Sequence, residues 1–256
     1  MLTHNQRILR RAIVCATFCT LFGGCAQAGE FSDSLDGDIG VGSYYISRIV
    51  RGTADQVTEL PYGNFDYGRI FMRVDTLGVK TAKLGQGYVE ITRKFSEDGF
   101  NTGVPKLHGL GNRPNSIPLG LGTLQTTSVG AFFFHAYHDI NHSGGNLFDM
   151  LYASELDSSR LSFYPMAGME YQTANYVRYY YGISNQEATL SQYAAYRPGG
   201  AVNPFLGLMC DAKLTDKYYL NLYFGRKWLG SSILASPIVD QSVMDTGFIA
   251  LSYRFE

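Results

Sequence analysis

Apolar and polar residues alternate along the last thirteen residues of the chain, 244–256. One face of this segment is apolar and ends in two aromatic rings: Gly247, Ile249, Leu251, Tyr253 and Phe255. The other face is small or polar and ends in an arginine: Phe248, Ala250, Ser252 and Arg254. A period of two is typical of a β-strand, and these faces suit a strand between lipid and a wet lumen. The segment therefore predicts the closing strand of an outer-membrane barrel, through which the barrel-assembly machinery would insert the protein.

Alternating segments recur through the rest of the chain. Counted back from the C-terminus, they cover residues 244–255, 217–228, 202–214, 160–172, 146–156, 128–138, 117–126, 86–95, 60–80 and 36–48. Ten segments predict an all-β, antiparallel, up-and-down barrel of ten strands, an even number as bacterial barrels have. Residues 60–80 are too many for one strand, so a break near Gly68 would add strands and give twelve as the alternative.

The connections between these segments alternate in length. Short turns follow every second segment, and longer loops lie between them at 49–59, 96–116, 139–145, 173–201 and 229–243. Bacterial barrels have short periplasmic turns and long extracellular loops, so both termini are expected on the periplasmic side. Residues 29–256 are interpreted as one barrel domain.

Charged residues fall mainly on the polar faces of the predicted strands, although Arg93 interrupts an apolar face. The inward candidates are Arg69, Arg73, Glu90, Asp149, Glu155, Arg160, Glu170, Arg226 and Arg254. In a narrow barrel such groups are expected to pair across the lumen as structural ion pairs.

The N-terminus carries a targeting signal. Three arginines, an apolar run over residues 12–24 and an Ala-Gln-Ala site predict a signal peptide, 1–28, cut between Ala28 and Gly29. A lipoprotein site with lipidated Cys25 is the alternative, but Phe22 stands where such a site has an aliphatic residue.

Composition fits a secreted barrel. Cleavage of the signal peptide removes three of the 21 basic residues and none of the 22 acidic residues, so the mature chain has a net charge of −4. This charge argues against nucleic acid as a partner. The chain has 19 Tyr, 16 Phe and 29 Gly, and no apolar run after the signal is long enough for a membrane helix. Once the signal peptide is removed, Cys210 has no cysteine partner within the chain. We expect it to act as a small apolar residue that is buried or faces lipid. No spacing predicts a metal site or a cofactor.

The loop 173–201 has features of its own. Ser184 and Glu187 form an S-x-x-E capping box that predicts a short helix to about Tyr193. Six tyrosines surround it: Tyr176, Tyr179, Tyr180, Tyr181, Tyr193 and Tyr196. We expect an aromatic girdle and a folded plug at the barrel mouth; a recognition surface for a partner is the alternative.

His135, His138, His142 and Ser143 lie close together in the sequence and are the candidates for a hydrolase site. A serine and a histidine with an orienting carboxylate could form a nucleophile. His142 and Ser143 fall in the predicted external turn, however, and His135 and His138 face opposite ways. We therefore predict no catalytic site and no enzyme.

Several motifs resemble the MipA/OmpV family of outer-membrane proteins (MltA-interacting proteins). The resemblance is most specific in the last third, at 179–184, 186–188, 194–200, 235–239 and 251–255, with looser likeness at 38–42, 60–61 and 66–69. It implies an outer-membrane barrel that scaffolds a lytic transglycosylase and a bifunctional penicillin-binding protein in peptidoglycan synthesis. Some members resemble small-solute pores or adhesins, and the lipid hydrolase remains a remote alternative.

Overall fold

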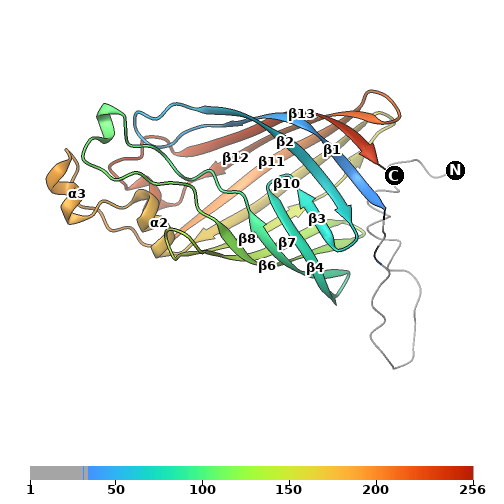
Figure 1. The fold of residues 1–256 in the computed structure, drawn as a ribbon, viewed down its shortest axis with the longest axis horizontal. Coiled ribbons are helices and arrows are strands. Elements are labelled where there is room, and N and C mark those ends of the chain that lie inside the picture. Colours follow the sequence, from blue (N-terminus) through green and yellow to red (C-terminus); the bar gives the residue numbers. More distant parts are fainter. Residues whose placement is uncertain (1–30, 32–33, 256) are drawn as a thin grey trace.

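The first and last strands pair with each other, and this pairing closes the sheet into a barrel (Figure 1). In the computed structural model, which describes residues 31 and 34–255, β1 (Leu35–Ile46) is antiparallel to β13 (Val243–Phe255), with Gly37 opposite Phe255. The other strands are β2 (Gln56–Tyr67), β3 (Ile70–Arg73), β4 (Thr76–Leu84), β5 (Gly87–Lys94), β6 (Pro118–Thr127), β7 (Gly130–Asp139), β8 (Asn146–Ala153), β9 (Leu156–Asp157), β10 (Leu161–Gln172), β11 (Ala201–Lys213) and β12 (Tyr218–Trp228). All the pairings between these strands are antiparallel.

The wall has twelve strands, because β8 and β9 both pair with β10 and form one interrupted strand. The prediction of ten strands is therefore wrong, and the twelve-strand alternative is correct. Residues 60–80 are not one strand but contain two tight turns. Gly68, with φ +57°, makes the first, and Val74, a non-glycine residue with φ +48°, begins the second. The other nine predicted strands are present, with ends that differ by at most three residues.

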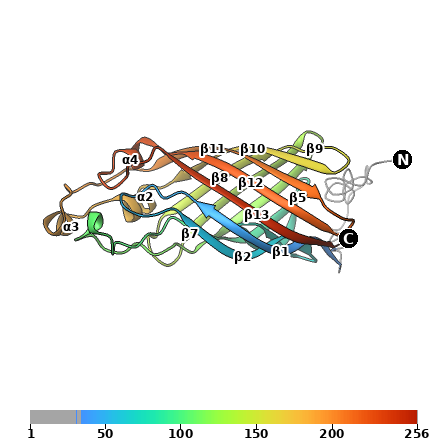
Figure 2. The same ribbon diagram turned by 90° about the horizontal axis from the view of Figure 1, so that it is seen from above.

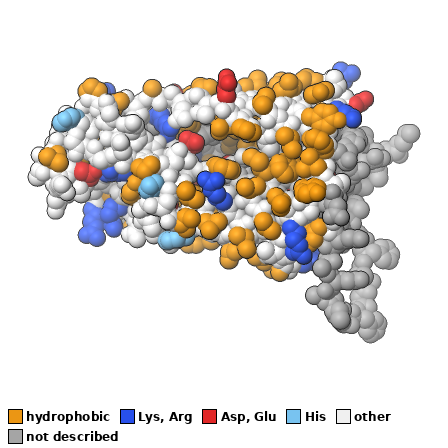
Figure 3. All heavy atoms as spheres, in the orientation of Figure 1, with side chains coloured by type: hydrophobic (Ala, Val, Ile, Leu, Met, Phe, Trp, Pro, Cys, Tyr) orange, Lys and Arg blue, Asp and Glu red, His pale blue; other side chains and the backbone are white. Residues whose placement is uncertain are grey.

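The two faces of the wall differ in chemistry. Outward positions carry exposed apolar side chains such as Val41, Leu208 and Ile249, and Figure 3 shows them as a broad belt over the strands. Cys210 also lies on this face, half-buried. Arg93 interrupts the belt on β5 and folds its guanidinium over the ring of Phe95, at 4.8 Å from the centroid. In β13, Ile249 and Leu251 point outward, whereas Ala250, Ser252 and Arg254 are buried inside.

The barrel has unequal ends (Figures 1 and 2). Short turns lie at the end that holds the C-terminus, and the long loops with their helices lie at the other. The loops contain η1 (Pro105–Leu107), α2 (Ala174–Tyr181), α3 (Asn185–Leu190) and α4 (Ser231–Leu234). Within the described residues, none of these helices has the length and apolar content needed to cross a membrane. The proposed signal peptide, its cleavage between Ala28 and Gly29 and the alternative at Cys25 lie outside the described residues.

Candidate functional site: the lumen and its plug

An arginine from the last strand joins four neighbouring strands on the luminal face near the short-turn end. The Arg254 guanidinium donates to both carboxylate oxygens of Asp38, at 2.7 and 2.6 Å, and to Asp211 at 3.1 Å. All three side chains are buried, and the ring of Tyr219 lies 3.6 Å from the guanidinium carbon. Asn221 donates to the second oxygen of Asp211, at 2.9 Å. Strands β1, β11, β12 and β13 are thereby joined through one charge cluster.

An aromatic layer lies between this cluster and the middle of the barrel. Its buried members are Tyr62, Met209, Phe248 and Ala250, and Tyr44, Val74, Tyr164, Met166 and Tyr223 pack against them. Phe248 lies at its centre, within 5.5 Å of the rings of Tyr44, Tyr62 and Tyr223. These side chains come from β10 to β13, β1, β2 and the β3–β4 turn, so they project into the lumen from one half of the wall.

Two lysines and two carboxylates form a tetrad farther along the lumen. Lys94 contacts Asp149 at 2.6 Å and Glu170 at 3.1 Å, while Lys227 contacts the other oxygen of Glu170 at 3.0 Å. The four residues come from β5, β8, β10 and β12, so the tetrad spans the barrel. Its formal charges cancel, as buried charges require.

A second ion pair lies on the β3–β7 side of the wall. Arg73 donates to both oxygens of Glu90, at 3.2 and 3.0 Å, and Glu90 is almost completely buried. His135 Nε2 lies 3.9 Å from Glu90. Its ring occupies the space over Gly122, where a Cβ atom would come within 2.0 Å of His135 Cδ2. A side chain at position 122 would therefore displace this histidine.

Six of the nine predicted inward residues do point into the lumen: Arg73, Glu90, Asp149, Glu155, Glu170 and Arg254. Three predictions are wrong. Arg226 is on the outward face, where it makes a bidentate pair with Asp245 at 2.7 and 2.8 Å. Arg69 and Arg160 lie in or beside short turns, outside the strands. The alternation in β12 shows why Arg226 faces outward. Tyr219, Asn221 and Tyr223 point inward, so the even-numbered residues of this strand point outward.

The long loops build a hydrophobic plug over the other end of the lumen. Three tyrosines of α2, namely Tyr176, Tyr180 and Tyr181, are buried in its core with Leu107, Ile233 and Ile238. The Tyr176 hydroxyl donates to Asp98 at 2.6 Å, and burial raises the pKa of this phenol. The Tyr180 hydroxyl donates to the Pro114 carbonyl at 3.1 Å. The plug predicted from this loop is present, but these three rings form its core and belong neither to a girdle nor to an open recognition surface.

The predicted capping box is present at α3. The Ser184 hydroxyl accepts from the Glu187 amide, and the Glu187 carboxylate accepts from the Ser184 amide at 2.9 Å. Glu187 also accepts from the Gly111 amide at 3.0 Å and from Arg113 at 2.6 Å, which joins two loops. Burial acts to raise the pKa of Glu187, but these hydrogen bonds outweigh it and lower the pKa to about 2. The helix ends at Leu190 rather than near Tyr193.

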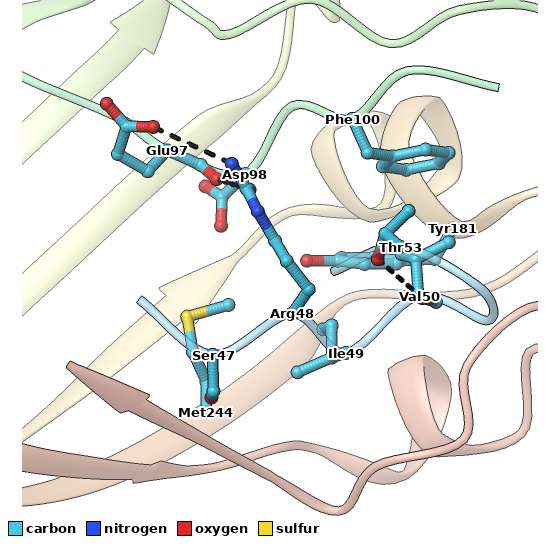
Figure 4. Close-up of a pocket in the computed structure, with 10 residues that line it drawn as sticks. All are labelled: Ser47, Arg48, Ile49, Val50, Thr53, Glu97, Asp98, Phe100, Tyr181 and Met244. Atoms are coloured by element: carbon cyan, nitrogen blue, oxygen red, sulfur yellow. Dashed lines mark hydrogen bonds and ion pairs between the residues drawn. The ribbon is translucent and has the colours of Figure 1, made fainter. Parts of the chain in front are cut away.

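Arg48 holds the loop after β5 to the top of β2. Its guanidinium donates to Gln56 and to the carbonyls of Glu97 and Gly99, the latter two at 2.7 and 3.0 Å. Figure 4 shows this side chain beside a cavity of about 10 Å³, which Tyr181 and Met244 also line. That volume corresponds to about one water molecule, so this cavity has no space for an organic ligand.

The three histidines and the serine of the candidate hydrolase site do not come together. Ser143 donates through its amide and hydroxyl to Asp139, at 2.7 and 2.6 Å, and thereby shapes its turn. The ring of His142 stacks on Tyr179. His138 Nδ1 lies 2.8 Å from Asn146 on the outward face, whereas His135 lies inside near Glu90. Residues 31 and 34–255 contain no group of three His, Cys, Asp or Glu side chains placed to hold a metal ion.

Comparison with known proteins identifies the family. The profile of the family described as MltA-interacting protein MipA matches residues 39–255. The chain belongs to this family. The MltA-interacting protein of Escherichia coli is 25% identical over 250 residues, which cover 91% of this chain and 93% of the relative. The outer membrane protein OmpV of Vibrio cholerae is 30% identical over 162 residues, covering 63% of this chain and 61% of OmpV.

The family assignment agrees with the architecture. The outer membrane protein Omp26La of Vibrio anguillarum is 28% identical over 182 residues, 71% of this chain and 67% of the relative. Together with the closed barrel, these relatives place the MipA-family chain in the outer membrane. Among solved structures, a Pseudomonas aeruginosa FadL homologue aligns over 88% of this chain and 91% of its own, with 10% identity and a TM-score of 0.33.

Several interior residues were missed from the sequence, among them Asp38, Asp211 and Lys227. Each lies on the polar face of its strand, so extending the alternation to every strand would have found them. Helix α2 was also missed. Its run of tyrosines has β propensity, and burial in the plug overrides that propensity.

Proposed function

We propose that the protein is a non-catalytic scaffold of the outer membrane that binds peptidoglycan-remodelling enzymes at its periplasmic end. The partners would be a lytic transglycosylase and a penicillin-binding protein. The main support is the obstruction of the lumen at several levels. The tetrad around Glu170 crosses the barrel, and the Arg254 cluster and the aromatic layer project into the lumen from neighbouring strands. The tyrosine core of the plug covers the outer end.

The names of the relatives support an interaction role. One relative is named for its interaction with MltA, and the family carries the same description. A protein that meets periplasmic enzymes has only its short turns and N-terminal segment available on that side. Scaffolding therefore predicts that partner contacts lie there and not on the external loops.

The turn between β11 and β12 is the periplasmic surface we select for the test. Lys213 pairs with Asp216 at 2.8 Å, and Lys217 lies over the ring of Tyr253, at 5.5 Å from its centroid. The Lys213 amide donates to the Arg160 carbonyl at 2.9 Å, which fixes the neighbouring turn against this one. The result is an ordered polar surface at the short-turn end.

The experiment is partner capture from crosslinked membranes with charge-reversed protein. Asp216→Arg with Lys217→Glu reverses the surface without changing the turn length, and we expect weaker capture of the transglycosylase and the penicillin-binding protein. The matched control is Lys83→Glu on the β4–β5 side, which lies half-way around the barrel from β11. Changes at the plug tip, residues 184–196, should leave capture intact. Equal capture by all variants would contradict the proposed surface, and no capture by the native protein would contradict scaffolding.

Two alternatives have separate readouts. A small-solute pore would give reproducible conductance steps in planar bilayers, and these steps would change with Glu170→Gln. We expect no stable large channels, because the tetrad around Glu170 spans the lumen. A lipid hydrolase would lose its activity with Ser143→Ala. We expect no release of fatty acid, because the Ser143 hydroxyl is bonded to Asp139 and not to a histidine.

A further inference from the structure

The outward face of β5 to β8 changes from apolar to polar within one step along the strands. The strand register places four apolar outward residues side by side, namely Ile91, Leu121, Ala136 and Phe148. The next outward row lies two residues, or about 7 Å, closer to the long loops. The same register places four further residues side by side there, namely Arg93, Leu119, His138 and Asn146. We call these four residues the upper row.

The upper row carries hydrogen-bond donors at both of its ends. At one end, the Arg93 guanidinium lies over the ring of Phe95, so this side chain extends toward the long loops. Its buried Nε has no hydrogen-bond partner within residues 31 and 34–255. Near the other end, His138 Nδ1 lies 2.8 Å from the side-chain oxygen of Asn146. A ring N–H on Nδ1 donates to that oxygen, which leaves the amide nitrogen of Asn146 as a donor.

The strands on this side of the barrel present no outward negative charge. Within β5, β6, β7 and β8, none of the outward positions is Asp or Glu. Two acidic residues of the adjoining segments are directed to other partners: Asp139 is buried and accepts from Ser143, and Glu97 lies 3.9 Å from Arg48. A cation on this face is therefore favourably placed for an anion from the membrane.

The opposite side of the barrel differs in charge. It is formed by β12, β13, β1 and β2, which lie half-way around the sheet from β5 to β8. There the outward Arg226 is already neutralised by its bidentate pair with Asp245, and Glu59 is exposed on β2. An anionic lipid should therefore prefer the side that carries the upper row.

We propose that the upper row binds lipopolysaccharide of the outer leaflet through the phosphates of its lipid A part. With the long loops on the extracellular side, this row lies at the level of the outer headgroups, and the apolar row beneath it contacts the acyl chains. A guanidinium such as that of Arg93 can donate two parallel hydrogen bonds to one phosphate. Asn146 lies three strands away, about 14 Å between backbones. Lipid A has a phosphate at each end of a disaccharide, which suits two polar positions separated by the aliphatic Leu119.

A phospholipid with a single phosphate would use only one end of the upper row, so we expect it to bind more weakly. The upper row and the proposed scaffold surface lie at opposite ends of the barrel. The two proposals can therefore fail separately.

Native mass spectrometry of the mature protein in detergent micelles tests the proposal. The protein is titrated with lipid A that carries both phosphates, with lipid A from which both have been removed, and with phosphatidylglycerol. Arg93→Gln removes the cation of the upper row. Arg226→Gln is the matched control, because it removes an outward arginine that already has a carboxylate partner.

We expect Arg93→Gln to weaken binding of phosphorylated lipid A about tenfold, the effect of one charge-assisted hydrogen bond. Arg226→Gln should bind as the native protein does. Equal losses for the two variants, or no loss for Arg93→Gln, would overturn the proposal. Equal binding of dephosphorylated lipid A or of phosphatidylglycerol by the native protein would overturn it as well. If Arg93→Gln is not heat-modifiable, Asn146→Ala replaces it and is judged against the same control.

Discussion

The two ends of the lumen are filled by different means. At the short-turn end, side chains of the strands meet in a charge cluster, where Arg254 joins Asp38 and Asp211. At the long-loop end, loops far apart in sequence pack Tyr176, Tyr180 and other apolar residues into a core. The first arrangement depends on register, since each charge must lie opposite its partner. The second resembles the core of a soluble protein and depends on volume and burial.

This difference predicts which end of the barrel tolerates substitutions better. Removing one charge from the strand cluster leaves its partners buried without compensation, so the whole wall should lose stability. Removing a ring from the plug leaves a cavity under loops that can open locally while the strands remain paired. The following predictions separate these two behaviours.

The largest effect is expected from the closing strand. Replacing Tyr253 and Phe255 together with alanine removes the aromatic end of the outward face of β13, and we propose that insertion into the outer membrane then fails. The measurement is the amount of heat-modifiable protein in the membrane fraction. Replacing Tyr193 and Tyr196 of the plug together is the matched control and should permit insertion. A normal level of membrane-embedded Tyr253/Phe255 variant would show that this strand end is dispensable.

The next effect concerns the charge cluster. Arg254→Ala leaves Asp38 and Asp211 buried without a cation, and we expect a loss of about 3–5 kcal/mol in the free energy of unfolding. Urea unfolding in detergent micelles measures it. Arg226→Ala removes the same side chain from the exposed pair with Asp245 and should change stability little. Similar losses for the two arginines would refute the special role of the buried cluster.

A smaller and local effect is expected in the plug. Tyr180→Ala removes a fully buried ring and should cost about 3 kcal/mol in the packing of the loops. Limited proteolysis should then cut the 173–200 loop faster while the strands stay protected. Leu190→Ala, at an exposed position of α3, is the control and should behave as native. Loss of strand protection in Tyr180→Ala would mean that plug and wall unfold together.

The smallest effect concerns Glu187. Its pKa is lowered to about 2, so its contribution to loop stability is present above the unfolded pKa and disappears as the pH falls through 2. Glu187→Gln keeps the capping box but removes the charge beside Arg113, and we expect a cost of about 1 kcal/mol at neutral pH. Hydrogen exchange of the 173–200 loop should differ between the two proteins at pH 6 and converge near pH 2. If the difference in hydrogen exchange between the two proteins is the same at pH 6 and at pH 2, the effect comes from the shape of the side chain at position 187 and not from its charge.

Regular alternation explains why so much of the wall was predictable. Nine strands were found from the period of two, and the faces of β13 were assigned as the structure has them. The pattern failed at residues 60–80 because the second turn begins at Val74, a residue type that rarely adopts positive φ. The prediction was also wrong for Arg226, because a charged residue can lie on the outward face when it pairs there, as Arg226 does with Asp245.

The sequence by itself determined the class of fold and the family. Period-two alternation, alternating loop lengths and an aromatic closing strand follow from the chemistry of lipid on one face of a strand, and this is a local property of each segment. Only the tertiary structure decided which charges pair, that the tyrosines of α2 form a plug core, and that β3 ends after four residues. These features join residues far apart in the chain, and such contacts depend on barrel closure and on the stagger between strands, which no single segment records.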